Sequence, residues 1–197
     1  MNVPADILSK VFDKDDWRLA TWVFNALTRL WGPFGVDRFS SDLNCLCSAF
    51  NSQDWCLGTA GVNAFAQSDW LAHLNWCNPP FWMIGRLIRF LQQTGAEAVV
   101  VVPLWQRSVW WPLVCPDGVH FAPFVTDARE LPISDSLFTS GYHSGNTLPC
   151  KVPGYRFFAL RISPSRAMTK LFCAASYECS CSGILPQMLR RTRWVRE

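Results

Sequence analysis

The stretch LNWCNPPFWMIGRLIRFLQQTGAEAVVVV, residues 74–102, decides the fold class. It opens with a short, strand-like apolar run that ends at Asn78. It closes with the continuous apolar run 98–102, which is typical of a strand buried on both faces of a parallel sheet. Between the two runs, apolar residues at helical spacing predict a helix that ends at Thr94 and Gly95. The buried face of that helix would be formed by Ile84, Leu87, Ile88 and Leu91.

Another helix and strand are predicted before this stretch. The helix would begin with Asp15 and Asp16 as capping residues and would stop at residues 32–33, a Gly-Pro pair. A short strand, FGVDRF, follows and places Asp37 near its carboxyl end. Helices and strands alternating over the first 105 residues predict an α/β fold with helices on the faces of the sheet. Ligands of such sheets bind beyond the carboxyl ends of the strands, so Asp37 and Asn78 are candidates for one site.

The rest of the chain is predicted to consist of loops and short elements. Residues 51–70 contain glycines and several polar residues and are predicted to form a loop. The segment SVWWPLV (108–114) is predicted to be a short helix, and GVHFAPF (118–124) and YRFFALRI (155–162) are predicted strands. Residues 125–153 are rich in Ser, Gly, Pro and Thr, which predicts a long loop.

Composition and charge favour one domain with a sizeable core. Of the 197 residues, 50% are hydrophobic and 17% are charged. Eleven tryptophans stand out, and we expect Trp105, Trp110 and Trp111 to belong to the core or a pocket wall rather than to a base-stacking platform. A net charge of +3 does not indicate strong non-specific nucleic-acid binding. The positive charge gathers near the C-terminus, in either a solvated tail or a phosphate-contacting one, at Arg190, Arg191, Arg193 and Arg196.

Sequence signals favour an intracellular protein, in the nucleus or the cytoplasm, without a membrane partner. The N-terminus lacks a signal-peptide pattern, and no apolar run approaches the ~20 residues of a membrane span. The nine cysteines are an odd number, which fits reduced thiols. The pairs Cys45/Cys47 and Cys179/Cys181 are spaced more closely than structural zinc ligands usually are. We therefore expect buried or incidental thiols and no bound metal.

The Asn-Pro-Pro-Phe loop at 78–81 has two possible roles. As a catalytic loop, it would present the side-chain oxygen of Asn78 and the carbonyl of Pro79 to the two N–H bonds of an exocyclic amine on a flat ring. Prolines fix the backbone direction and add no competing N–H donor, and Phe81 would stack on the ring. As a purely structural loop, the prolines would open a helix that Asn78 caps.

The order of several motifs resembles one enzyme family. The motifs DDW, VDRFSSDLN, FNS, NAFAQSDW, NPPF, VVVVPLW and WW follow one another over residues 15–125. This order resembles the phage-type (Dam-like) DNA adenine methyltransferase domain, in particular the form carried by DIRS-type retrotransposons. The resemblance implies a Rossmann-like methyltransferase sheet, S-adenosylmethionine as the cofactor and DNA as the partner. It also implies that the target adenine is held by Asn78, Pro79, Pro80 and Phe81.

The same resemblance implies a set of cofactor-binding residues. Asp37, Ser40 and Asn44 match the family's early aspartate, small residue and asparagine. Asn63, in the NAF motif, takes the place of an aspartate that is implied to contact the adenosine, and Asp69 is an alternative carboxylate. No Gly-x-Gly loop follows the first strand, so the usual glycine-rich cofactor cradle is missing.

The N-terminal segment NVPADILSK resembles the closing motif of retroelement RNase H domains. We therefore expect residues 1–14 to be an RNase H remnant, with Asp6 catalytically idle in a gene fragment that starts at a late methionine. Residues 15–162 would form the Dam-like domain, and residues 163–197 a C-terminal extension with a basic tail. The alternative function is an inactive nucleic-acid-binding or scaffolding module of a reverse transcriptase/RNase H polyprotein. A truncated, non-functional product of a pseudogene is a further alternative.

Overall fold

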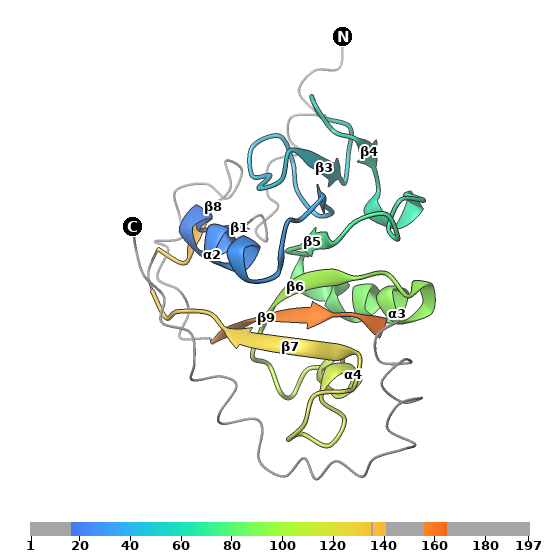
Figure 1. Cartoon of the computed structure of the whole chain (residues 1–197). Coiled ribbons are helices and arrows are strands. Elements are labelled where there is room, and N and C mark those ends of the chain that lie inside the picture. Colours follow the sequence, from blue (N-terminus) through green and yellow to red (C-terminus); the bar gives the residue numbers. More distant parts are fainter. Residues whose placement is uncertain (1–16, 135, 141–155, 165–197) are drawn as a thin grey trace, which may run out of the picture.

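A seven-stranded sheet dominates the part of the chain that the structure, a computed structural model, describes: residues 17–134, 136–140 and 156–164 (Figure 1). The strand order is β4-β3-β2-β5-β6-β9-β7. The first five of these strands run parallel, whereas β9 is antiparallel to both β6 and β7. The strands are β2 (Val36–Asp37), β3 (Ala49–Ser52), β4 (Gly61–Val62), β5 (Asn75–Cys77), β6 (Ala98–Pro103), β7 (Val125–Glu130) and β9 (Phe157–Ile162).

The chain reverses its direction across the sheet between β2 and β5. From β2 it moves outward through β3 to β4, and it then returns to the other side of β2 to form β5 and β6. This reversal is a topological switch point, where a crevice opens beyond the carboxyl ends of two neighbouring strands. The α/β prediction is confirmed, and the strand order is compatible with a Rossmann-like methyltransferase fold.

Helices cover both faces of the sheet. On one face lies α2 (Thr21–Trp31), which buries Val23, Phe24 and Leu27. On the other face lie α3 (Ile84–Thr94) and the short helix α4 (Trp111–Val114). The sequence pattern predicted α3 to within a residue, because its buried stripe and the left-handed Gly95 at its end are both visible in the letters.

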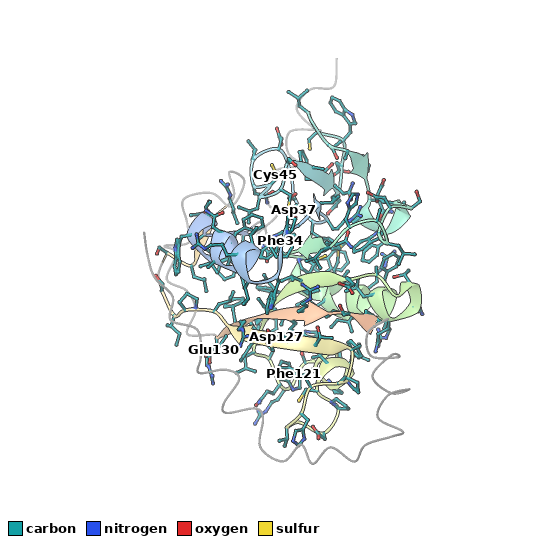
Figure 2. The ribbon with its side chains drawn as sticks, viewed as in Figure 1. Phe34, Asp37, Cys45, Phe121, Asp127 and Glu130 are labelled. Atoms are coloured by element: carbon teal, nitrogen blue, oxygen red, sulfur yellow. The ribbon has the colours of Figure 1, made fainter. Side chains whose placement is uncertain are left out.

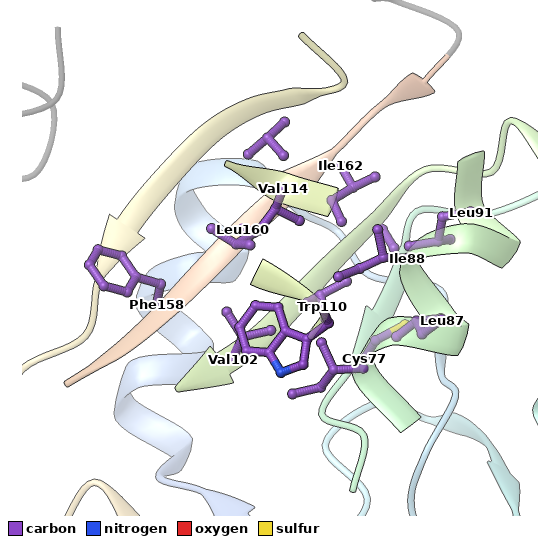
Figure 3. Packing of buried hydrophobic residues seen from close by; sticks show 14 of the residues in the cluster. Cys77, Leu87, Ile88, Leu91, Val102, Trp110, Val114, Phe158, Leu160 and Ile162 are labelled. Atoms are coloured by element: carbon purple, nitrogen blue, oxygen red, sulfur yellow. The ribbon is translucent and has the colours of Figure 1, made fainter. Parts of the chain in front are cut away.

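Strand β6 lies between the two cores and is buried along its whole length. Its even-numbered residues, such as Val102, pack in the cluster under α3, and its odd-numbered residues, such as Val101, pack in the cluster under α2. Figure 3 shows the first cluster, with Leu87, Ile88 and Leu91 of α3 beside the strand residues. The prediction of a strand buried on both faces is therefore confirmed.

The antiparallel edge of the sheet is closed by β7. Asp127 and Glu130 lie along this strand (Figure 2). Glu130 forms an ion pair with Arg156, which directly precedes β9, so the two strands are joined by charge as well as by their backbone ladder. Within the described residues, no helix has the length and apolar character needed to cross a membrane.

Two predictions for the N-terminal half are wrong. The helix predicted from Asp15 starts only at Thr21 and has no side-chain cap, because Trp17–Leu19 form strand β1 instead. This strand pairs antiparallel with β8 (Phe138–Ser140), a partner more than a hundred residues away that no local pattern reveals. Residues 51–70 are not only loop, since they contain the end of β3, strand β4 and the 3-10 turn η1 (Ala64–Ala66).

Two predictions for the C-terminal half are also wrong. Residues 118–124 form turns rather than a strand, because the carboxylate of Asp117 accepts hydrogen bonds from the backbone N–H groups of Val119 and His120. The predicted loop 125–153 contains β7 and β8, and its residues 141–153 lie outside the described part. The predicted α4 and β9 are confirmed.

Candidate active site

Asp37 and Asn78 lie at the switch point of the sheet. Asp37 is the last residue of β2, and Asn78 directly follows β5. The two strands are paired in parallel, with Asp37 opposite Trp76. Both polar residues therefore emerge at the same edge of the sheet, as the sequence predicted.

The side chain of Asn78 is held in one orientation. Its Nδ2 donates a hydrogen bond of 2.6 Å to the carbonyl oxygen of Trp17, in β1. An oxygen at that distance requires the nitrogen end of the amide, so Oδ1 points elsewhere, and Oδ1 makes no hydrogen bond within the described part of the chain. The predicted alternative role as a helix cap is wrong, because the 3-10 turn η2 (Phe81–Met83) is preceded by Pro80 and has no side-chain cap.

The two prolines leave a second acceptor open. The carbonyl of Pro80 accepts the backbone N–H of Met83 at 2.8 Å. The carbonyl of Pro79, by contrast, receives no hydrogen bond from the residues described. Neither proline has an N–H group with which to satisfy a neighbouring acceptor. The Asn78 side-chain oxygen and the Pro79 carbonyl are thus two consecutive acceptors at the end of β5 that receive no hydrogen bond from the described residues.

An aromatic corner stands beside these acceptors. The half-buried ring of Phe81 meets the ring of Trp105 at 70°, with 4.9 Å between the centroids. Trp105 comes from the loop after β6, the strand next to β5, so neighbouring strand ends build the corner. Trp110 and Trp111 are only 4% and 5% exposed and belong to the core, as predicted, while Trp105 forms a wall of the site.

The Asp37 carboxylate organises the loop that follows β2. It accepts hydrogen bonds from the backbone N–H groups of Leu46 (3.1 Å) and Phe39 (3.4 Å). In Figure 2 this loop, which carries Cys45, lies above Asp37. Only 2% of Asp37 is exposed, and burial raises its pKa to about 7. The Asp37 carboxyl therefore fixes the backbone of this loop and does not project into solvent.

The loop after β2 has no Gly-x-Gly motif, and polar side chains fix its conformation instead. Asn44 accepts hydrogen bonds from the backbone N–H and the hydroxyl of Ser41, at 2.6 and 3.2 Å. The backbone N–H of Ser40 donates to the carbonyl of Asn51, which ties the loop to β3. The hydroxyl of Ser40 is buried beside the Asp37 carboxyl, and its hydrogen bond to that group opposes the rise that burial causes in the Asp37 pKa. Ser40 therefore helps to fix the loop at Asp37.

Asn63 is engaged with its own turn. It follows β4, which is separated from β2 by β3. Its backbone φ is +58°, a left-handed conformation that asparagine tolerates, and its side chain accepts the N–H of Phe65 at 3.3 Å. Asn63 is exposed and makes no hydrogen bond with Asp37 or Asn78. The structure thus joins Asp37 and Asn78 at one switch point but leaves Asn63 two strands away, about 10 Å along the sheet.

Arg38 is an organising residue that the sequence reasoning missed. It follows Asp37 directly and is only 1% exposed. Its guanidinium donates to Asn75 (2.7 Å), Asn51 (2.8 Å) and Asp69 (2.7 Å) and stacks over the Trp70 ring. The hydrogen bond from Arg38 lowers the pKa of Asp69, so this predicted cofactor residue is the counter-ion of a buried arginine. The available signal was an asparagine within each of two apolar segments, Asn51 in β3 and Asn75 in β5.

Five of the nine cysteines lie in the described part of the chain, whereas the basic tail does not. Cys45, Cys47, Cys56, Cys77 and Cys115 are free thiols, and burial raises the pKa of Cys47 to about 12. No group of metal-ligating side chains gathers among the described residues. The pair Cys179/Cys181, the basic tail at 190–196 and the RNase H-like segment at 1–14 lie outside the described part.

Because Asp37 is buried, the stability of the protein should depend on pH. The pKa of this carboxyl is about 7 in the folded state and near its ordinary value of 3.8 in the unfolded state, so folding favours the protonated form. Its stabilising effect is complete below pH ~4 and is lost as the pH rises to ~7. We expect Asp37→Asn to remove this part of the pH dependence of the free energy of unfolding, measured in urea at pH 5 and pH 8. An unchanged difference between the two pH values would contradict the assignment.

A mostly parallel sheet whose strand order reverses between β2 and β5 places this chain in the Rossmann-like class of α/β folds. The sequence model for DNA N-6-adenine-methyltransferase (Dam) matches residues 8–142, more than half of the chain, and the chain belongs to this family. Membership implies the use of S-adenosylmethionine and suggests DNA as the substrate. Comparison with curated proteins gives no significant match.

Proposed function

We propose that this protein transfers a methyl group to the exocyclic amine of adenine in DNA. The observation that best supports this proposal is the pair of acceptors at the end of β5. Asn78 Oδ1 is aimed away from Trp17 by the hydrogen bond of its own amide nitrogen, and the Pro79 carbonyl has no partner among the described residues. Two adjacent acceptors match the two N–H bonds of an aromatic amine.

The chemistry explains why acceptors are needed. The lone pair of an exocyclic amine is delocalised into the ring, so the amine is a weak nucleophile. Hydrogen bonds from its two N–H groups to Asn78 and Pro79 draw the nitrogen towards tetrahedral geometry and localise the lone pair. When bound, S-adenosylmethionine would supply an electrophilic methyl group, whose S–C bond breaks as the N–C bond forms and leaves a neutral thioether. After the new N–C bond has formed, the amine loses one proton to solvent, so no strong base is required of the chain.

The aromatic corner supplies the surface for the base. Phe81 offers a stacking face whose position is fixed by its contact with Trp105. An enzyme acting on duplex DNA must first extrude the base, and a site lined by aromatic faces compensates for the lost stacking. We propose that Phe81 stacks on the adenine while Trp105 limits the width of the pocket and Pro80 keeps the turn rigid.

We propose that the cofactor lies on the β2 side of the same edge. The loop after β2, which carries Ser40 and is held by the hydrogen bond from Leu46 to Asp37, borders that edge of the sheet. Asn44 shapes that loop through its hydrogen bonds to Ser41. Asn63 and Asp69 would border the adenosine end of the cofactor, with Asp69 kept in place by its hydrogen bond from Arg38.

The substitution Asn63→Asp tests whether Asn63 borders the adenosine end of the cofactor. An aspartate can still accept the N–H of Phe65, so η1 should persist, and its charge would strengthen a hydrogen bond from a ribose hydroxyl. We expect S-adenosylmethionine to bind about tenfold more tightly, measured by isothermal titration calorimetry. Ser68→Asp, in the same segment, is the matched control and should leave the affinity unchanged. Equal affinity of Asn63→Asp and wild type would refute the assigned role.

The reaction itself is tested by methyl transfer from labelled S-adenosylmethionine to unmethylated plasmid DNA. Digestion of the product should place the label in N6-methyladenine. Label in another base, or no transfer by a folded protein that binds the cofactor, would count against the proposed reaction.

The second candidate is an inactive nucleic-acid-binding or scaffolding module of a retroelement polyprotein. It is favoured by the loop after β2, which lacks the glycine-rich cradle, and by Asn63, which is engaged with its own turn. The retrotransposon origin rests on the RNase H-like letters of residues 1–14. DNA binding without cofactor binding would favour this candidate over the enzyme.

A further inference from the structure

Trp82 is an exposed tryptophan next to the proposed adenine site. It directly follows Phe81 in η2, and 69% of it is exposed. Its neighbours anchor this turn to the core, since Phe81 packs on Trp105 and Ile84 is fully buried. Trp82 therefore stands at a fixed place beside the Asn78 and Pro79 acceptors.

Position, not exposure, distinguishes this residue. Single exposed apolar residues are common on protein surfaces, and Trp55 is 75% exposed in the loop between β3 and β4. That loop is separated from β5 by β2, whereas Trp82 is four residues beyond Asn78 in the segment that joins β5 to α3. Trp55 thus provides a chemically matched residue away from the adenine site.

The surface that continues from Trp82 is positively charged. The buried stripe of α3 is formed by Ile84, Leu87, Ile88 and Leu91. Trp82 in η2 and Arg86 and Arg89 in α3 are exposed on the opposite side. The Arg86 guanidinium lies over the ring of Phe65. Residues 70–96 contain no acidic side chain, and neither do residues 98–116, which carry Arg107. A basic stripe headed by an aromatic residue is complementary to a nucleic-acid strand, with phosphates on the arginines and a base on the ring.

We propose that Trp82 stacks on the bases left beside the extruded adenine, while Arg86 and Arg89 contact the adjacent phosphates. This inference rests on the proposed function and assigns to the same site a residue that opens the duplex. Extruding a base exposes the faces of its neighbours, and an inserted or abutting aromatic ring covers them. A single-stranded substrate has no such gap, so it needs Trp82 less.

The test compares native and heat-denatured unmethylated plasmid DNA as substrates for the full chain. Trp82→Ala should lower methyl transfer to native DNA about tenfold and to denatured DNA less than about twofold. Trp82→Phe should retain most of the activity, and Trp55→Ala should leave both substrates unaffected. Thermal unfolding should be unchanged in all variants, because both tryptophans are exposed. Equal losses on native and denatured DNA, or the same loss in Trp55→Ala, would overturn the proposal.

A binding measurement separates this proposal from the proposed reaction. Fluorescence anisotropy, without cofactor, would follow a labelled duplex in which one adenine faces an abasic site. Trp82→Ala should bind it about tenfold more weakly than wild type, and Trp55→Ala should bind it equally well. If wild type binds this duplex but transfers no methyl group, the reaction fails while the role of Trp82 stands. If Trp82→Ala binds as tightly as wild type, or wild type binds no DNA, the role of Trp82 is refuted.

Discussion

Asn78→Ala is expected to reduce adenine methylation at least about a hundredfold while S-adenosylmethionine affinity stays within about twofold. The substitution removes the Asn78 side-chain oxygen, which receives no hydrogen bond from the described residues, but it removes no contact of the loop after β2. The loss should therefore appear in the methyl-transfer rate. Labelled-methyl incorporation and calorimetry on the same preparation would measure the two quantities.

The control for Asn78→Ala is Gln93→Ala, which removes an exposed amide at the far end of α3. It should leave rate and affinity unchanged. Asn78→Asp adds a second comparison, because it keeps an acceptor but places oxygen against the Trp17 carbonyl. It should retain less activity than wild type. An Asn78→Ala variant with more than half of the activity, or with a parallel loss of cofactor binding, would contradict the role given to this residue.

Arg38→Met is expected to cause the largest loss of stability, about 3 kcal/mol in the free energy of unfolding. The buried guanidinium serves three acceptors at once, on Asn51, Asn75 and Asp69. Methionine fills much of the space but donates no hydrogen bond, so two buried amide oxygens lose their donor. Urea unfolding monitored by tryptophan fluorescence would give the change.

Asp69→Asn is the matched comparison, since it changes the partner at the exposed end of the same network. The Asp69 side chain is 45% exposed, and water can replace part of its ion pair with Arg38. We expect a loss of about 1 kcal/mol. If Arg38→Met cost no more than Asp69→Asn, the buried network would not be the link between the ends of β2, β3 and β5 that the geometry indicates.

The sequence predicted the elements whose stability is local. Helix α3 has a complete buried stripe and a glycine in the left-handed region, and β6 is a continuous apolar run, so both could be located from their own letters. Strand β1 depends instead on a backbone ladder with β8, in which Trp17 faces Ser140. Strand β4 has two residues, too few for a periodic pattern, whereas β2 could be located from the short run FGVDRF.

The residues of the site could also be predicted from the sequence, but the orientation of their side chains could not. Asp37 and Asn78 could be placed at strand ends because apolar runs precede them. The direction of the Asn78 amide is set by a carbonyl 61 residues earlier in the chain, and the burial of Asp37 is set by the loop that returns to it. Arg38 was missed because a charged residue beside a short strand usually lies at the surface.

A calorimetric titration of the full chain with S-adenosylmethionine tests most directly whether this protein binds the cofactor that its family implies. We expect saturable binding with a stoichiometry near one, because the described part of the sheet reverses its strand order once, between β2 and β5. Binding should survive in Asn78→Ala. No binding by the folded protein at about 1 mM cofactor would show that this edge of the sheet is not a cofactor site.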